Sequence, residues 1–252
     1  MNRAKAIKAI RDKLKSGSHS IGSWMQIPNA SIAEIMGSSG YDWVAIDMEH
    51  GAISNTQLPD LFRALELGET LPIARLAEDS AKECKQALDA GAGGLIIPMI
   101  ESASQLIEVR NNSCWPPNGS RGVAFHRANM FGGRFEDYIN EAQAPLLIAM
   151  IESSQGLDNI NEILDVEGLD AILIGPYDLS ASLGVTAKFK SVEYTNALKK
   201  ILEAANKKNI PIGIHVVEAS PDELQSRIGE GYRFIPYSID TVMLRTQAKF
   251  NS

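Results

Sequence analysis

The sequence predicts an α/β protein built as a single domain, a (β/α)8 TIM barrel over residues 1–252. Short apolar runs of strand length alternate with segments whose apolar residues recur at helical spacing, and this alternation indicates a parallel sheet. Eight such runs occur, which is the number of strands that closes a barrel. An open doubly wound sheet is the alternative. Such a sheet usually carries a glycine-rich loop after its first strand, where this chain reads Gln26-Ile27-Pro28-Asn29.

Each expected strand is a short run dominated by apolar side chains, often Val, Ile and Leu. Continuous rather than alternating apolarity is typical of parallel strands that are buried on both faces. In chain order, the expected strands are Ser20–Ile27, Asp42–Asp47, Leu71–Arg75, Gly94–Met99, Leu146–Ile151, Ala171–Ile174, Ile210–Val216 and Tyr232–Tyr237.

The segments between the strands have apolar residues every three or four positions, as at Ile7, Ile10 and Leu14. Gly91 marks the end of one helix, and Pro221 lies near the start of another. The expected helices are Ala4–Leu14, Ser31–Met36, Thr56–Leu67, Ser80–Ala90, Ala103–Asn111, Gln155–Leu164, residues 179–183, Val192–Lys208, Ser220–Ile228 and Ser238–Phe250.

One long segment has no regular pattern. Residues 113–138, SCWPPNGSRGVAFHRANMFGGRFEDY, are rich in Gly, Pro, Asn and Arg, and we expect a loop there. A loop of this length inside a compact domain is usually functional or takes part in assembly.

Composition and charge exclude several classes of protein. The chain is 44% hydrophobic and 22% charged, and its net charge of −7 gives no global attraction to nucleic acid or acidic membranes. No apolar run approaches the length of a membrane span, and the basic amphipathic residues 1–17 lack the apolar core of a signal peptide. Cys84 and Cys114 fit no zinc or redox spacing, so we expect reduced thiols in a cytoplasmic protein.

Polar residues mark the carboxyl ends of the predicted strands, the rim on which barrel enzymes place their active sites. They are Asp47, Glu49, His50, Arg75, Glu101, Glu152, Asp178, His215 and Tyr237. Any one of them, taken alone, is as well explained as a solvated loop residue. That explanation is much weaker for four of them taken together, because each follows or ends an apolar strand on the same face of the barrel. These four are Glu152, Asp178, His50 and Arg75.

Glu152 and Asp178 follow two successive strands and indicate a divalent-ion site. A pair of acids on one rim is costly to leave bare, so it should hold a cation or share a proton. Two hard oxygen ligands with water in the remaining positions suit Mg2+ or Mn2+. The alternative is that Asp178 caps the helix that follows it, and the two roles are compatible.

Asp47, His50 and Arg75 indicate acid–base and anion-binding chemistry. An aspartate beside a histidine can fix the tautomer of the imidazole and raise its basicity, which suits proton transfer. The alternative is a buried histidine with a hydrogen-bonded partner. Arg75 offers a planar fork to a carboxylate or enolate, or alternatively acts as a counter-ion for the rim acids. The last two strands end in HVVEAS and PYSIDT rather than in glycine-rich loops, which favours an uncharged or carboxylated substrate over a sugar phosphate.

Six motifs, in this order and over most of the chain, resemble the HpcH/HpaI aldolase family, the metal-dependent class II pyruvate aldolases. The motifs are GSWMQIPNASIAEIMGSSGYDWVAIDMEHG (22–51), LPIAR (71–75), IIPMIESASQ (96–105), PPNGSRGV (116–123), MIESSQGLDNINEI (150–163) and GLDAILIGPYDLSASLG (168–184). DMEHG and GPYDLS are the most specific of them.

The resemblance implies a modified (β/α)8 barrel that assembles as a homo-oligomer, commonly a hexamer of paired subunits that exchange their final helices. It implies a divalent metal, Mg2+ or Mn2+ with Co2+ as a further candidate. The implied reaction is reversible cleavage of a 4-hydroxy-2-oxo acid to pyruvate and an aldehyde through a metal-stabilised enolate.

The resemblance also assigns roles to single residues. Glu152 and Asp178 match the metal ligands, and His50 matches the general base with Asp47 as its partner. Arg75 matches the arginine that orients pyruvate and stabilises its enolate. The backbone amides of Tyr177 and Asp178 match those that receive the pyruvate carboxylate, as a helix N-terminus can.

Two positions near the expected site depart from the family pattern. Met150 stands where well-studied aldolases tend to have Gln, and Tyr177 stands where they tend to have Ala. The first change removes a hydrogen bond to pyruvate, and the second narrows the pocket. Two alternatives therefore stay open: a related metal-dependent lyase acting on a CoA thioester, and a degenerate protein that binds a 2-oxo acid without turnover.

Overall fold

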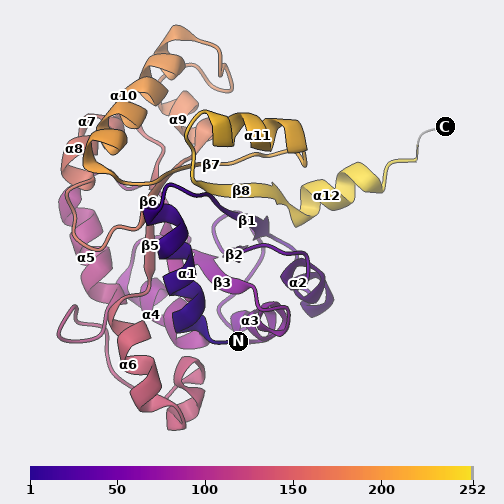
Figure 1. Ribbon diagram of the computed structural model, residues 1–252, viewed down its shortest axis with the longest axis vertical. Helices are drawn as coiled ribbons and strands as arrows, with labels where there is room; N and C mark the ends of the chain where they lie inside the picture. Colours follow the sequence, from indigo (N-terminus) through magenta and orange to yellow (C-terminus); the bar gives the residue numbers. More distant parts are fainter. Residues whose placement is uncertain (251–252) are drawn as a thin grey trace.

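The computed structural model describes residues 1–250, and within them eight parallel strands close into one barrel in chain order (Figure 1). The predicted fold class is confirmed. The strands are β1 (Ser20–Met25), β2 (Trp43–Asp47), β3 (Leu71–Arg75), β4 (Gly94–Ile97), β5 (Leu146–Ile151), β6 (Ala171–Ile174), β7 (Ile212–Ile214) and β8 (Phe234–Ile239).

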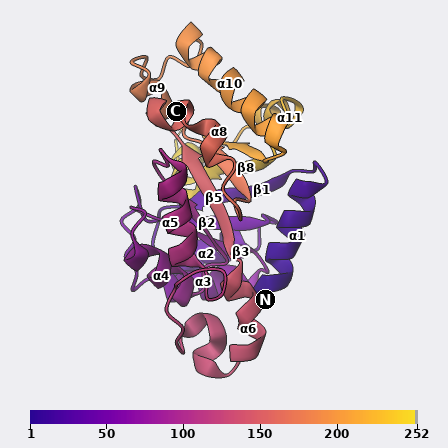
Figure 2. The ribbon, with the colours of Figure 1, turned by 90° about the vertical axis from the view of Figure 1, so that its left-hand side faces the viewer.

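The helices lie around the outside of the barrel (Figure 2), and several of them begin at a serine. The side chains of Ser80, Ser102, Ser191 and Ser220 each accept a backbone N–H from the first turn that follows, as N-caps do. The helices are α1 (Arg3–Lys15), α2 (Ala30–Gly37), α3 (Leu58–Leu67), α4 (Ala81–Ala90), α5 (Ala103–Ser113), the 3-10 helix η1 (Arg127–Gly132), α6 (Phe135–Gln143), α7 (Ser154–Asp158), α8 (Ile160–Ile163), α9 (Pro176–Ser182), α10 (Val192–Lys208), α11 (Pro221–Gly229) and α12 (Asp240–Gln247).

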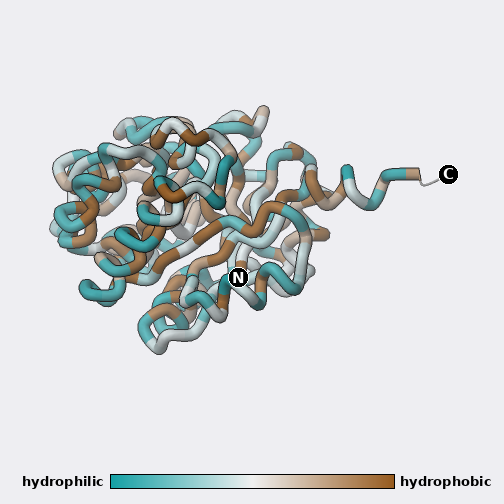
Figure 3. The backbone as a smooth tube through the Cα atoms, turned by 90° about the horizontal axis from the view of Figure 1, so that it is seen from above, coloured by the Kyte–Doolittle hydropathy of each residue, from teal (hydrophilic) through white to brown (hydrophobic). Residues whose placement is uncertain are grey.

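Apolar side chains fill the barrel and the layer between strands and helices, and Figure 3 shows hydrophobic residues along the strands. Inside the barrel, Trp43 stacks on Phe234 with ring centroids 4.3 Å apart. Gly22 makes room for that stack, because a Cβ at this position would lie 2.1 Å from the Trp43 ring. The interior is therefore solid, and ligands have access only at its rim.

The segment 113–138 is not simply a loop, and this prediction was wrong. It contains η1 and the start of α6, which lie at the end of the molecule opposite α10 (Figures 1 and 2). Trp115 packs edge-on against Tyr138 at 5.2 Å, and Ala128 and Ala142 complete a small separate core. The turn-forming residues in the sequence hid a helix that is stabilised by this tertiary packing.

Several predicted boundaries also differ, and three of them have a visible structural cause. The helix expected over residues 155–164 is divided into α7 and α8 at Asn159, whose side chain donates to the Glu101 carbonyl at 2.7 Å. β7 is shorter than expected because only Ile212–Ile214 pair regularly with a neighbour. β8 extends to Ile239, so α12 begins at Asp240 rather than at Ser238.

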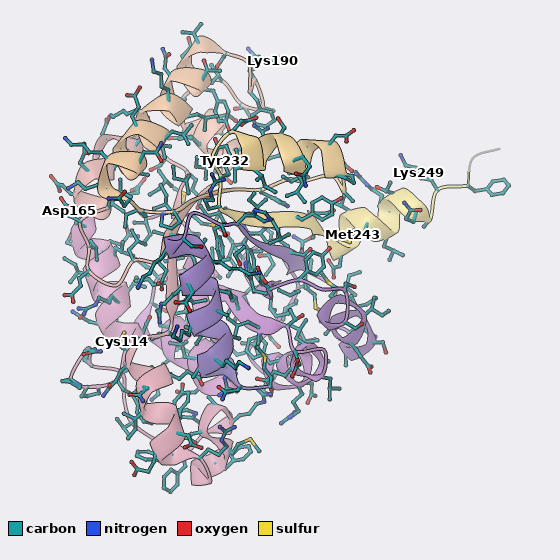
Figure 4. The ribbon with its side chains drawn as sticks, viewed as in Figure 1. Cys114, Asp165, Lys190, Tyr232, Met243 and Lys249 are labelled. Atoms are coloured by element: carbon teal, nitrogen blue, oxygen red, sulfur yellow. The ribbon has the colours of Figure 1, made fainter. Side chains whose placement is uncertain are left out.

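The helix α12 extends away from the barrel (Figures 1 and 3), and Figure 4 shows Met243 and Lys249 on this projecting segment. Its first residue anchors it, because the Asp240 carboxylate accepts the backbone N–H groups of Gln26 and Ile27, both at 2.9 Å. Asp240 is also the only buried residue of α12. Among residues 1–250, no helix is both long and apolar enough to cross a membrane.

Candidate active site

The carboxyl ends of the strands surround a cavity of about 340 Å³. Six of the residues singled out from the sequence line it: His50, Arg75, Met150, Tyr177, Asp178 and His215. Asp47 and Glu152 are buried beside them. A larger hollow of about 470 Å³ lies on the outer surface, between α5 and the end of α8, away from the strand ends. The predicted residues therefore meet at one place, the rim of the barrel.

Asp47 and Arg75 form the most completely bonded pair in the site. The sheet register places them side by side at the ends of β2 and β3. Arg75 donates from Nε to Asp47 Oδ1 at 2.9 Å and from Nη2 to Oδ2 at 2.6 Å. Gln26 Nε2 donates to Oδ2 at 2.8 Å. Burial favours the neutral acid, but these donors outweigh it and hold the pKa of Asp47 below its usual value.

This geometry corrects the expected contact between Asp47 and the imidazole of His50. Asp47 Oδ1 accepts the backbone N–H of His50 at 3.1 Å and so shapes the turn after β2. The His50 ring points elsewhere: its side chain is 58% exposed, and its Nε2 lies 3.9 Å from Glu49 Oε2. Sequence proximity suggested the pairing, but the bidentate fork of Arg75 occupies the carboxylate instead.

Glu49 connects His50 with Arg75. Its Oε2 lies 3.3 Å from Arg75 Nη1, yet this buried oxygen accepts no hydrogen bond among the described residues. Burial, together with the nearby charges of Asp47 and Asp178, raises the pKa of the Glu49 carboxyl despite the opposing effect of Arg75. Arg75 is further fixed by Trp24, because its guanidinium lies 4.5 Å from the centroid of that ring.

Glu152 is nearly inaccessible, at 3% exposure. Its Oε1 accepts the Met99 backbone N–H at 2.7 Å. Burial, with the charges of Glu49 and Asp178, raises its pKa to about 7 against the lowering effect of that hydrogen bond. Gly175 allows the close packing, since a Cβ there would lie 2.3 Å from Glu152 Oε2. The site therefore holds more negative charge than its own cations compensate.

These donors fit a divalent cation. Glu152 and Asp178 both supply hard carboxylate oxygens, and the charge of Asp178 adds to burial and to Glu49 in raising the pKa of Glu152. Within residues 1–250, no cluster of three or more His, Cys, Asp or Glu side chains is arranged to hold a metal. A cation would therefore have these two protein ligands, with water or substrate oxygens in the other positions.

The sequence left open that Asp178 caps the helix that follows it, and the structure corrects this. Gly175 is the N-cap of α9, Pro176 is its first residue, and Asp178 lies within its first turn. In the same turn, Tyr177 is 52% exposed and its ring meets Phe189 edge-on at 5.1 Å. Met150, at 4% exposure, closes the inner end of the cavity with an apolar side chain.

Sequence reasoning assigned no role to Gln26, Trp24, Glu49 or His215. Glu49 and His215 were visible as polar residues at strand ends. Gln26 and Trp24 lie at the end of β1, an apolar stretch in which nothing marked them. Only the barrel geometry places them against Asp47 and Arg75.

Comparisons with known proteins give a consistent picture. The family model for HpcH/HpaI aldolase/citrate lyase matches residues 20–246. A 2-keto-3-deoxy-L-rhamnonate aldolase of Escherichia coli strain K12 is 35% identical over 235 residues, covering 92% of this chain and 87% of that enzyme.

Solved structures agree with the sequence relatives. An HpcH/HpaI aldolase/citrate lyase family protein from Burkholderia cenocepacia J2315 superposes with a TM-score of 0.88, at 30% identity and 95% coverage of each chain. The citrate synthase SbnG superposes with a TM-score of 0.80, at 28% identity, over 94% of this chain and 93% of its own.

Proposed function

The chain belongs to the HpcH/HpaI aldolase/citrate lyase family and is a class II aldolase, and we propose that it cleaves a 4-hydroxy-2-oxo acid reversibly to pyruvate and an aldehyde. One observation carries the proposal. Arg75 and Asp178 line one cavity on the rim of the barrel, and the Glu152 carboxylate packs directly against Gly175, which also lines it.

The relative's substrate indicates a substrate class. A 2-keto-3-deoxy acid has a carbonyl at C2 and a hydroxyl at C4, so aldol cleavage between C3 and C4 releases pyruvate whatever the rest of the chain. We propose that the substrate belongs to this class, with the C4 end leaving as a hydroxyaldehyde.

His50 is our proposed general base. Its ring is exposed at the cavity, where it can take the proton from the 4-hydroxyl, directly or through water, as the C3–C4 bond breaks. The bonding electrons pass toward the 2-oxo group. Arg75, held in place by Asp47 and Trp24, presents its remaining N–H groups to the negative charge that develops there.

Glu152 and Asp178 would hold a divalent ion, for which we propose Mg2+ or Mn2+, with Co2+ able to substitute. When bound, such an ion supplies Lewis-acid stabilisation of the negative charge on the 2-oxo acid. The unpaired amides in the first turn of α9, at Tyr177 and Asp178, would receive the substrate carboxylate, and Met150 would pack against its apolar part.

We also propose a cytoplasmic homo-oligomer, a hexamer in which α12 is exchanged between subunits. The projection of α12 supports exchange, because Leu244 is 56% exposed on a helix that the barrel does not cover. The free thiols of Cys84 and Cys114 support a reducing compartment.

A second candidate is carbon–carbon bond chemistry on a CoA thioester, which the structural similarity to a citrate synthase favours. The two are distinguished by incubating the protein and Mg2+ with pyruvate in D2O, with pyruvate plus an aldehyde panel, and with oxaloacetate plus acetyl-CoA. Deuterium entry into the pyruvate methyl group and aldol products support our proposal. Citrate formation alone supports the second candidate, and pyruvate binding with neither deuterium entry nor aldol products indicates a degenerate protein.

A further inference from the structure

His215 has no role in the mechanism above, although it lies at the rim directly after β7. Its ring lines the main cavity together with Trp24 and Arg75. It also lines a second cavity of about 250 Å³ beside α9, α10 and α11. The two cavities share Pro176, Tyr177, His215 and Val217, so His215 lies where the site continues outward.

The imidazole of His215 has an unpaired nitrogen. Nε2 is buried and has no hydrogen-bond partner among the described residues. Burial lowers the pKa of the ring to about 4, although a hydrogen bond to the Ser238 backbone raises it in part. The ring is therefore neutral at neutral pH. In a neutral imidazole that is protonated at Nδ1, the unpartnered Nε2 is an acceptor.

The protein surroundings do not supply the missing donor. The nearest aromatic neighbour, Trp24, meets the ring edge-on at a centroid distance of 6.0 Å, and Val217 is apolar. An unpaired buried acceptor is costly, whereas a hydroxyl placed beside it satisfies both groups.

The second cavity suits a chain that carries hydroxyl groups. Tyr177, Phe189 and Tyr194 give it aromatic walls, and Glu218 and Arg227 add charge. Arg227 Nε is a further buried polar atom without a hydrogen-bond partner in the described residues. Aromatic faces combined with unpaired polar groups fit a hydroxylated carbon chain better than a purely apolar one.

We propose that His215 is a specificity-determining residue whose Nε2 accepts a hydrogen bond from a hydroxyl group of the aldehyde, while the rest of the aldehyde extends past Tyr177 toward the second cavity. This inference rests on the proposed aldolase function. It makes hydroxyaldehydes the preferred acceptors.

The test compares lactaldehyde with propanal, which differ by one hydroxyl group, as acceptors for pyruvate with Mg2+. Wild-type enzyme should prefer lactaldehyde by about tenfold in kcat/KM, the size of one hydrogen bond. His215→Leu should bring the ratio close to one by lowering kcat/KM for lactaldehyde alone. His215→Gln, which restores an acceptor, should recover part of the preference. His19→Leu, at an exposed histidine before β1, is the matched control.

An unchanged ratio in His215→Leu, or no preference in the wild-type enzyme, would overturn the assignment. If His215→Leu fails to fold, His215→Gln still decides, because a full loss of preference in that folded variant also contradicts the proposal. Absence of product from both aldehydes in the wild-type enzyme refutes the aldolase function itself, a result distinct from an unchanged ratio.

Discussion

The two sides of the rim differ in how far the protein satisfies its own charges. On the β1–β3 side, Asp47 accepts bonds from Arg75, Gln26 and two backbone amides. On the β5–β7 side, Glu152 accepts a single backbone N–H, and His215 Nε2 accepts none. The Asp47 carboxylate on the first side is fully paired without ligand, so Asp47 and Arg75 support the fold as well as the proposed chemistry. The second side keeps unpaired acceptors, and we propose that a cation and a substrate complete it.

The contrast predicts the largest effect for Glu152→Gln. This change removes one of the two proposed carboxylate ligands, so cleavage activity should fall roughly a thousandfold, in line with several kcal/mol of charge stabilisation. Stability should not fall, because the change removes a buried charge near Glu49 and Asp178. Calorimetric titration with Mn2+ and thermal melting check both results, with Glu162→Gln on the exposed face of α8 as control. If Glu152→Gln bound Mn2+ with wild-type affinity, the proposed difference between the two sides of the rim would be contradicted.

Arg75→Ala should show the opposite pattern, with a loss of stability. It leaves the fully buried Asp47 carboxylate without its charged partner, which typically costs about 3–5 kcal/mol of unfolding free energy. Arg75→Lys should recover only part of this, because an ammonium group cannot donate two parallel hydrogen bonds. Urea unfolding measures the difference, and equal midpoints for the wild-type protein and Arg75→Ala would contradict the account.

His50→Ala should slow cleavage about a hundredfold, the lower range for a general base, because the ring is half-exposed and water can partly replace it. Mn2+ binding and stability should stay close to wild type, since the His50 ring holds neither Glu152 nor Asp178. Single-turnover cleavage rates test this. A wild-type rate would assign the proton transfer to water or to His215.

The smallest effect is on the pH dependence of metal binding. The pKa of Glu152 is raised to about 7, so the folded protein without metal binds a proton there that the unfolded chain has already lost. This group therefore lowers stability as pH rises from about 4.5 toward 7, and a cation must displace the proton below pH 7. Mn2+ affinity should fall about tenfold per pH unit below that value. An affinity that is flat between pH 5 and 7 would exclude the protonated state.

The fold was predictable because strands buried on both faces leave continuous apolar runs, and polar residues that end them stand out. Glu152 and Asp178 were found in this way. The start of helix α6 was not predicted, because its packing on Trp115 depends on tertiary contacts that no local sequence pattern records. The sequence paired the Asp47 carboxylate with the His50 ring, because the two residues are close in the chain. The sheet register instead places Asp47 beside Arg75. The unpaired state of His215 depends on all of its neighbours and is visible only in the assembled barrel.

The central claim is that the incomplete side of the rim requires a divalent cation. The most direct test is cleavage of a 2-keto-3-deoxy acid by protein dialysed exhaustively against chelator, with pyruvate release as the signal. We predict no activity after dialysis and recovery on addition of Mg2+, Mn2+ or Co2+. Full activity in the presence of chelator would contradict the account.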